Sequence, residues 1–305
     1  FDWVIVILYP MISLGIGIYV SKLITNMNDF ICVGKGLGTA LGVATLTGTE
    51  LGLITVMYSS QKAFNGGFAT FHIALIAGVV TFFIGISGFI LYRLRAMGVL
   101  TIPEFYERRF DRKTRILGGI MMSVGGILNM GLFLKIGSMF IVGITGLSES
   151  SWALPAVMIF LISLVLIYTC LGGMVAVVIA DYVQFVVLSF GMILTTYLAI
   201  KNLGWDNIFN TVAKFKKEAG FNPMIEDSGF GMEYIMFVGF IGLVGCAIWP
   251  TAVSRALAAN SPKTVKKQFT FASISYMIRF LLPYFWGICA FVWIMNEGGA
   301  LKEAF

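Results

Sequence analysis

The chain has 305 residues, of which 58% are hydrophobic and 12% are charged, whereas about 25% of residues are charged in an ordinary soluble domain. This composition excludes a soluble globular protein and predicts a membrane protein. The formal net charge of +6 does not require a nucleic-acid partner, because an excess of basic residues on the cytoplasmic side is usual in membrane proteins.

Apolar runs of about 20 residues, which cross about 30 Å of hydrocarbon as helices, recur along the chain. Their helical pattern of polarity excludes an outer-membrane barrel, whose strands are about 10 residues long. The predicted fold class is therefore an all-α, polytopic membrane protein. The eight predicted spans are residues 1–24, 36–60, 68–92, 116–147, 152–171, 177–200, 230–258 and 269–296.

The second predicted span contains the stretch "LGVATLTGTELG", in which threonine and glycine surround Glu50. Glycine weakens a helix, and threonine hydroxyls compete for backbone groups. A carboxylate at membrane depth is costly and normally faces the interior of the helix bundle. We therefore predict a helix interruption near Glu50, whose freed carbonyl groups can bind a cation. A continuous helix that packs closely on a neighbour through its small residues is the alternative.

Other ionisable residues inside the predicted spans are few: His72, Lys135, Asp181 and Arg279. For Lys135 and Arg279 we expect an interhelical ion pair or a side chain that reaches the interface. His72 is expected to be interfacial or hydrogen-bonded, because one histidine cannot build a metal site without partners. The sequence has no cluster at metal-ligand spacing and no catalytic motif, so nothing supports a membrane enzyme.

The basic residues indicate the orientation of the chain. If the connections alternate between two sides, thirteen Lys and Arg residues lie on one side and six on the other. The richer side is expected to be cytoplasmic, which places the N-terminus outside the plasma membrane. The thirteen are Lys22, Lys35, Arg93, Arg95, Arg108, Arg109, Arg112, Lys113, Arg115, Arg255, Lys263, Lys266 and Lys267, and the six are Lys62, Lys201, Lys214, Lys216, Lys217 and Lys302.

The main cytoplasmic connection is predicted to contain a short helix. Thr101 can cap its first turn, Pro103 fits that turn, and Glu104 is favoured near the positive end of the helix dipole.

The sixth predicted span begins within "YTCLGGMVAVVIADYVQFVVL". This stretch resembles the signature of the solute:sodium symporter family, which has a Tyr, a Gly-Gly turn, Ala-Val, an Asp and, three residues later, a Gln. "TIPEFYERRFD" resembles the family's cytoplasmic segment Thr-x-Pro-Glu-Phe-x-x-x-Arg-Phe, and "SRALAANSPKTVKK" resembles its Arg-x-x-Ala-Ala segment. A proline at position 250, five residues before Arg255, resembles the pattern of the proline-transporting branch. Directly before the Asp, this chain has Ile179-Ala180 where the family usually has Trp-Thr. The matching residues are Tyr168, Gly172, Gly173, Ala176, Val177, Asp181 and Gln184.

The resemblance implies a LeuT-like fold of inverted five-helix repeats, in which the first helix of each repeat is broken near the membrane midplane. Residues 1–305 would form one transporter domain, with an extra N-terminal helix at 1–24, a first repeat at 36–200 and two helices of the second repeat at 230–296. The second break would lie near Gly239, Gly242 and Gly245. Because the family usually has about thirteen helices, we expect this chain to be an N-terminal portion.

The resemblance also implies the site residues. Sodium would be bound by the carbonyls of Gly48 and Leu51, with negative charge from Glu50 and Asp181. The candidate substrate-binding residues are Thr49, Thr55, His72, Gly242 and Cys246, and the candidate gating or structural residues are Tyr168, Gly172, Gly173, Gln184, Pro250 and Arg255.

The predicted function is uptake of a small organic solute by alternating access, with Na⁺ as the coupling ion. The expected partners are the solute and the lipid bilayer, with no obligate protein partner. Coupling to H⁺ is an alternative, because desolvation can raise the pKa of a carboxylate such as Glu50 toward neutrality. A membrane sensor that keeps the fold without transporting is another alternative. The sequence leaves the identity of the solute open.

Overall fold

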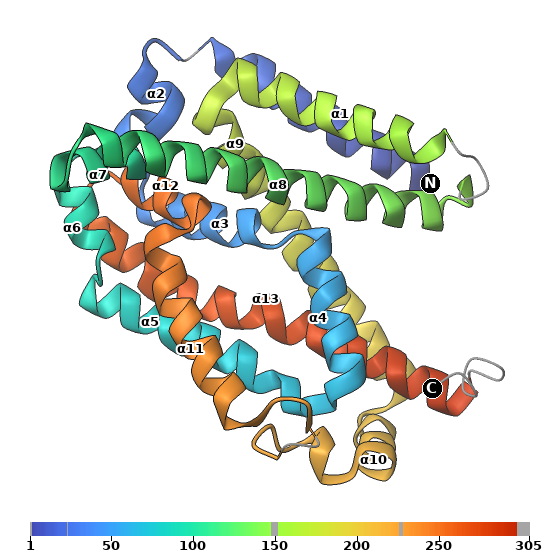
Figure 1. Ribbon diagram of the computed structural model, residues 1–305. Coiled ribbons are helices and arrows are strands. Elements are labelled where there is room, and N and C mark those ends of the chain that lie inside the picture. The colour runs from blue at the N-terminus through green and yellow to red at the C-terminus, as the bar shows by residue number, and fades with distance from the viewer. Residues whose placement is uncertain (1, 23, 148–151, 226–227, 298–305) are drawn as a thin grey trace. The chain divides into compact units, whose positions relative to one another are not determined.

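The computed structural model describes residues 2–22, 24–147, 152–225 and 228–297. Lys302, which is in the orientation count, lies outside them. The described backbone is helical and contains no β-strand, apart from an isolated bridge between Leu37 and Ala259 (Figure 1). The helices are α1 (Asp2–Ser21), α2 (Met27–Cys32), η1 (Val33–Lys35), α3 (Thr39–Glu50), α4 (Leu53–Gly66), η2 (Gly67–Thr70), α5 (Phe71–Ser87), α6 (Leu91–Ala96), α7 (Ile102–Arg109), α8 (Arg112–Ile144), α9 (Ala153–Leu203), α10 (Trp205–Lys216), η4 (Lys217–Gly220), α11 (Gly231–Ile248), α12 (Pro250–Ala258) and α13 (Pro262–Glu297).

The chain divides into two compact units, each built from three segments. Each unit takes segments from both of the predicted repeats. The first unit is Phe1–Thr45, Ile90–Val183 and Ile248–Val265, and the second unit is Leu46–Phe89, Gln184–Ala247 and Lys266–Phe305.

In the first unit, the predicted cap of α7 is confirmed. The Thr101 hydroxyl accepts a hydrogen bond from the Glu104 N–H at 3.3 Å, and the Glu104 carboxylate accepts one from the Leu100 N–H at 2.7 Å. Pro103 lies in the first turn, where no N–H is needed. Asp111 caps α8 in the same way, through the N–H of Thr114 at 2.7 Å. These two caps define the corner between α7 and α8.

Helix α9 has a kink at Gly173, with φ 49° and ψ −149°. This region of backbone space is accessible almost exclusively to glycine. A Cβ at this position would also lie 2.6 Å from Cδ2 of Phe30 in α2. Gly173, the second residue of the Gly-Gly turn, is therefore held at a positive φ where only glycine fits.

The loops that flank α3 and α12 are joined in the first unit. The Leu37 N–H donates to the Ala258 carbonyl at 3.0 Å, and the Leu37 carbonyl accepts from the Asn260 N–H at 3.0 Å. Leu37 and Ala258 are buried together with Val178 of α9. This contact brings the start of α3, the middle of α9 and the end of α12 to one place.

The core of the second unit lies among α4, α5, α10 and α13. A Cβ on Gly287 of α13 would lie 2.0 Å from the Ser60 carbonyl oxygen of α4, so these helices approach too closely for a side chain there. The fully buried core residues include Ala63, Ala74, Ile208, Val212, Ile288 and Val292.

The predicted interruption near Glu50 is also found. Helix α3 ends at Glu50 and α4 begins at Leu53. Between them Gly52 adopts an extended conformation, with φ −109° and ψ 168°. The sequence thus correctly placed a break within a membrane-length apolar run.

The second predicted break is found within the seventh predicted span, but it lies beyond the three glycines and not at them. Helix α11 runs through Gly239, Gly242 and Gly245 and ends at Ile248. The interruption comes at Trp249, because Pro250 lacks an N–H and fits only the first turn of a new helix. Gly242 serves close packing instead, since a Cβ there would lie 3.3 Å from Cγ1 of Val80 in α5.

The count of eight spans is not confirmed. The described residues contain four helices that are long and apolar enough to cross a membrane, or five if α11 and α12 form one broken span. Windows of apolarity cannot tell whether a helix is continuous. Predicted spans 152–171 and 177–200, for example, correspond to the two helical stretches of α9 on either side of the kink at Gly173, although Ala153–Leu203 is counted as one helix above.

Candidate functional site

The first unit contains a buried ion pair between Asp181 of α9 and Arg255 of α12. Nη2 of Arg255 lies 2.9 Å from Oδ2 of Asp181. The Thr45 hydroxyl of α3 donates to the same carboxylate oxygen at 2.5 Å and accepts from Nε of Arg255 at 3.4 Å. All three residues are at least 92% buried, with exposed fractions of 8%, 4% and 0% for Asp181, Arg255 and Thr45. The cluster therefore joins three helices within this unit.

The remaining guanidinium nitrogen of Arg255 bonds within its own helix. Nη1 contacts the Thr251 carbonyl at 3.4 Å and the Ser254 hydroxyl at 3.2 Å. Each of the three guanidinium nitrogens therefore has an acceptor. Arg255 was counted among the cytoplasmic loop charges, and this is corrected here: the residue is buried, and its charge is balanced by Asp181.

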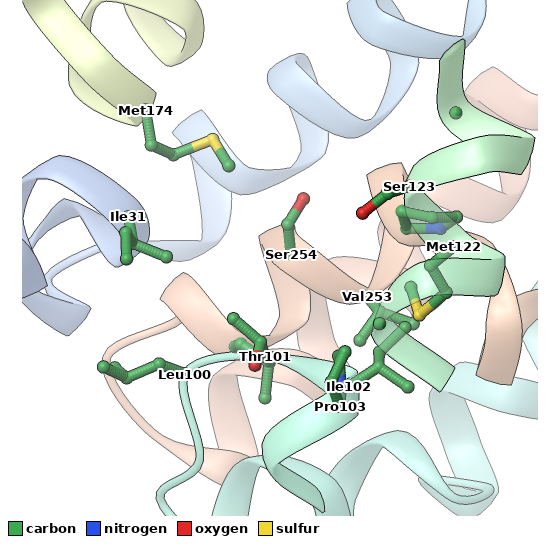
Figure 2. A pocket seen from close by; sticks show the side chains of 14 residues that line it. Ile31, Leu100, Thr101, Ile102, Pro103, Met122, Ser123, Met174, Val253 and Ser254 are labelled. Carbon is green, nitrogen blue, oxygen red and sulfur yellow. The ribbon is translucent and has the colours of Figure 1, made fainter. Parts of the chain in front are cut away.

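The Ser254 hydroxyl also reaches a cavity of about 410 Å³ in the first unit. In Figure 2 the side chains of Ser254 and Ser123 border this cavity from α12 and α8, and Met174 extends toward it from α9. Most of the lining is apolar, and Pro250 is the predicted site residue that contributes to it. The cavity is large enough for a small molecule.

The second unit contains the α3–α4 interruption with Gly48, Glu50 and Leu51. The Glu50 carbonyl accepts a hydrogen bond from the Thr55 hydroxyl at 3.2 Å, and the Leu51 carbonyl accepts one from the Gln184 side chain at 3.5 Å. Both distances exceed the usual range for their type of hydrogen bond, so both bonds are weak. Carbonyls freed by the break thus receive side-chain donors, which agrees with the rule that polar backbone groups are satisfied at membrane depth.

The Glu50 side chain forms an ion pair with Arg279 of α13. Nη1 of Arg279 lies 3.5 Å from Oε2 of Glu50, and Arg279 is 6% exposed. Three residues earlier on α3, the Thr47 hydroxyl donates to the Ser275 hydroxyl at 2.8 Å. Two polar contacts therefore join the last turn of α3 to α13, which confirms the ion-pair expectation for Arg279.

The candidate substrate-binding residues occupy separate places in the second unit. Thr49 lies in the last turn of α3 and Thr55 in the first turn of α4. Nδ1 of His72 lies 2.5 Å from the Ala69 carbonyl oxygen, and its ring packs edge-on against Phe230. The expectation of a hydrogen-bonded histidine is thus confirmed.

The two candidates on α11 have contacts typical of packing. Gly242 faces Val80. Cys246 is buried, and its thiol donates to the Leu243 carbonyl of the same helix at 3.0 Å.

The candidate gating or structural residues also have defined contacts. Tyr168 packs on Gly17 of α1, where a Cβ would lie 2.7 Å from the Cβ of Tyr168. Gly173 forms the kink of α9, Gly172 precedes it and lies close to Gly17 of α1, and Pro250 begins α12. Asp181 belongs to the first unit and Gln184 to the second.

Sequence reasoning missed two features. Thr45 lies in the threonine-rich stretch, but no spacing rule connects it to Asp181, 136 positions away. Nor did the sequence show that Arg279 would pair with Glu50. The available signal was that the predicted spans contain few charges of either sign, which limits the possible pairs.

Comparison with known proteins gives a family assignment. The model of the sodium:solute symporter family matches residues 30–296. The chain belongs to this family. Membership agrees with the resemblance seen in the sequence and makes the chain part of a family of multi-pass membrane transporters.

Related transporters cover nearly the whole chain. A sodium/glucose cotransporter of Vibrio parahaemolyticus is 27% identical over 95% of this chain and 55% of its own length. The osmoregulated proline transporter OpuE of Bacillus subtilis is 25% identical over 97% of this chain and 60% of its own length. The chain therefore spans little more than half the length of these relatives.

A solved structure of a Na⁺-coupled sialic acid symporter in a substrate-bound outward-open state has the same fold. Its TM-score is 0.81 at 21% identity, over 100% of this chain and 63% of the other. The described part of the chain is thus all-helical, with a LeuT-like fold.

Proposed function

We propose that the protein carries out Na⁺-coupled uptake of a small organic solute by alternating access. The observation that carries this proposal is the interrupted α3–α4 segment in a chain of the sodium:solute symporter family. Relatives named for glucose and proline support a small organic solute. They differ in solute, so the family alone does not select one.

The proposed sodium site lies at the α3–α4 interruption. Backbone carbonyls of broken helices are common ligands of Na⁺ in transporters, and we assign this role to Gly48 and Leu51. A carbonyl oxygen has two lone pairs, so the Leu51 carbonyl can bind a cation beside or in place of its long bond from Gln184. Glu50 supplies negative charge next to these carbonyls.

The Arg279 ion pair limits the electrostatic contribution of Glu50. One unit charge about 5 Å from the cation contributes roughly 3 kcal/mol at an effective dielectric constant of about 20. Because Arg279 has the opposite charge and contacts Glu50, it cancels part of this attraction. We expect a net effect of about 1 kcal/mol on sodium affinity, which corresponds to a change of about fivefold.

The test is solute uptake by the complete protein reconstituted in proteoliposomes. Glucose, proline and sialic acid are supplied with an inward gradient of Na⁺ or of K⁺ at fixed pH. We expect uptake of a solute from the panel to require Na⁺, and Glu50→Gln to raise the half-maximal Na⁺ concentration by about fivefold. Glu107→Gln, which removes a partly exposed carboxylate on α7, is the matched control and should leave sodium dependence unchanged.

Equal uptake in Na⁺ and K⁺ would contradict sodium coupling. Uptake driven by a pH gradient in K⁺ would then favour H⁺ coupling. Absence of uptake of every solute under both gradients would favour a role without transport.

We also propose that the protein lies in the plasma membrane with its N-terminus outside. The excess of basic residues on one set of connections supports this orientation. A cysteine at Arg109 should react with impermeant reagents only from the cytoplasm, and one at Lys216 only from outside. Labelling of position 109 in intact cells would reverse the orientation.

A further inference from the structure

Arg279 has hydrogen-bond donors that nothing in the described chain accepts. Its side chain is almost completely buried, yet Nε and Nη1 have no hydrogen-bond partner among the described residues. The contact of Nη1 with Glu50, at 3.5 Å, has the distance of an ion pair but not the geometry of a hydrogen bond. Buried polar groups are nearly always hydrogen-bonded, so an exception requires an explanation.

Arg255, which is also buried, is a useful comparison. In the first unit, Nε, Nη1 and Nη2 of Arg255 all have oxygen acceptors. The chain therefore builds one arginine–carboxylate pair with every guanidinium nitrogen in use and another with unused donors. A pair that served only to join helices would be expected to resemble the first.

The guanidinium of Arg279 is held by aromatic rings. Its Cζ lies 4.0 Å from the ring centroid of Tyr276 and 4.6 Å from that of Phe280. Such stacking fixes the plane of an arginine while leaving its N–H groups available for bonds in that plane. The unused donors are thus held in a defined orientation.

The location of Arg279 connects these donors to transport. Arg279 forms an ion pair with Glu50, which is the last residue of α3 and lies immediately before the interruption. Ser275, one turn earlier on α13, contacts Thr47 of the same end of α3. Both contacts join the last turn of α3 to α13. A cationic donor and hydroxyl groups thus gather beside the proposed sodium site.

We propose that Arg279 binds the carboxylate group of the transported solute, so that the protein selects solutes with a carboxylate over uncharged analogues. Arginine is the side chain that best matches carboxylate oxygens. Binding would satisfy the unused donors and add a negative charge beside the Glu50–Arg279 pair, where a bound cation can balance it. This inference rests on the proposed transport function and narrows its substrate class.

The test uses solutes matched in shape that differ in the carboxylate. Thermal stabilisation of the complete purified protein is measured in saturating Na⁺ and in K⁺, with glucuronate against glucose and proline against prolinamide. We expect a carboxylate member to bind at least about tenfold more tightly than the partner that lacks the carboxylate, since hydrogen bonds to charged groups are the strong ones. Arg279→Gln should abolish the difference. Lys135→Gln, a basic residue of α8 that is exposed, is the matched control and should preserve it.

Two further variants separate recognition from stability. Arg279→Lys keeps the charge but loses the planar donors, and should retain part of the preference. If Arg279→Gln does not fold, the double variant Glu50→Gln/Arg279→Gln removes both buried charges, avoids an unpaired one, and should equally lose the preference.

The outcomes distinguish this inference from the sodium proposal. Failure of every carboxylate probe to stabilise the protein, or a preference that survives Arg279→Gln, would overturn the assignment of Arg279. Sodium-dependent uptake of glucose that is unaffected by Arg279→Gln would do the same and leave sodium coupling standing. Carboxylate binding that depends on Arg279 but is equal in Na⁺ and K⁺ would support Arg279 and count against sodium coupling.

Discussion

Removing one member of the Asp181–Arg255 pair should strongly destabilise the protein. At 2.9 Å and an effective dielectric constant of about 20, the attraction between the two charges is about 6 kcal/mol before desolvation. Removing one partner leaves the other charge buried without its counter-ion, which usually lowers the free energy of unfolding by about 3–5 kcal/mol. For Arg255→Met, where Asp181 keeps the Thr45 hydroxyl, we expect a loss within this range.

The measurement is a double-mutant cycle on thermal unfolding of the complete protein. Arg255→Met and Asp181→Asn should each lower Tm by about 6 °C or more, given about 2–4 °C per kcal/mol for chains of 150–250 residues. The double variant should lose less than the sum of the two, by about 1–3 kcal/mol. Arg108→Gln is the control, because its ion pair with Glu104 is partly exposed and should contribute less than about 1 kcal/mol. Equal losses for Arg108→Gln and Arg255→Met, or additive losses in the cycle, would refute the reasoning.

Two further predictions concern local structure in the first unit. Gly173→Ala should lower the free energy of unfolding by about 2–5 kcal/mol, because it combines a strained φ with a Cβ 2.6 Å from the Phe30 ring. The control Gly131→Ala, in open space on α8, should be neutral or slightly stabilising. Similar Tm values for the two variants would contradict the strained conformation at Gly173. Partial burial opposes ionisation of Glu104, but hydrogen bonds from the Leu100 N–H and Arg108 outweigh it and lower the pKa of this carboxyl. A carboxyl whose pKa is lowered on folding stabilises the fold at pH values above its unfolded-state pKa, so Glu104→Gln should reduce Tm above about pH 5. The difference in Tm from wild type should disappear as the pH falls through the folded-state pKa. A difference in Tm that grows on acidification would contradict this prediction.

The sequence predicted those features of the fold that depend on neighbouring residues. The cap at Thr101 and the interruption after Glu50 each follow from residue types within a few positions of one another. Whether a helix continues over longer distances was harder to predict, because an apolar segment has the same composition whether the helix is straight, kinked or broken. The count of eight spans could not be decided for this reason.

Contacts between distant segments were not accessible from spacing. Asp181 and Arg255 are separated by 74 positions, and the sequence offered more than one basic residue as a possible partner for each carboxylate within the predicted spans. Glycine was ambiguous in the same way: Gly242 on α11 allows close packing against Val80, whereas Gly52 lies in a real interruption. Which role a glycine takes depends on the neighbouring helix, and that neighbour is known only from the fold.

The two buried pairs change how the carboxylates of this chain should be interpreted. A carboxylate in an apolar span suggests a free negative charge for a cation, and Glu50 and Asp181 were first interpreted in this way. Each instead contacts an arginine, at 3.5 Å and 2.9 Å, so each pair has no net charge. A cation at the α3–α4 interruption would therefore depend mainly on backbone carbonyls, with Glu50 as a partly cancelled contribution. If Arg279 also binds an anionic solute, the solute itself restores the missing negative charge, and sodium and solute would each favour binding of the other through a reciprocal coupling free energy.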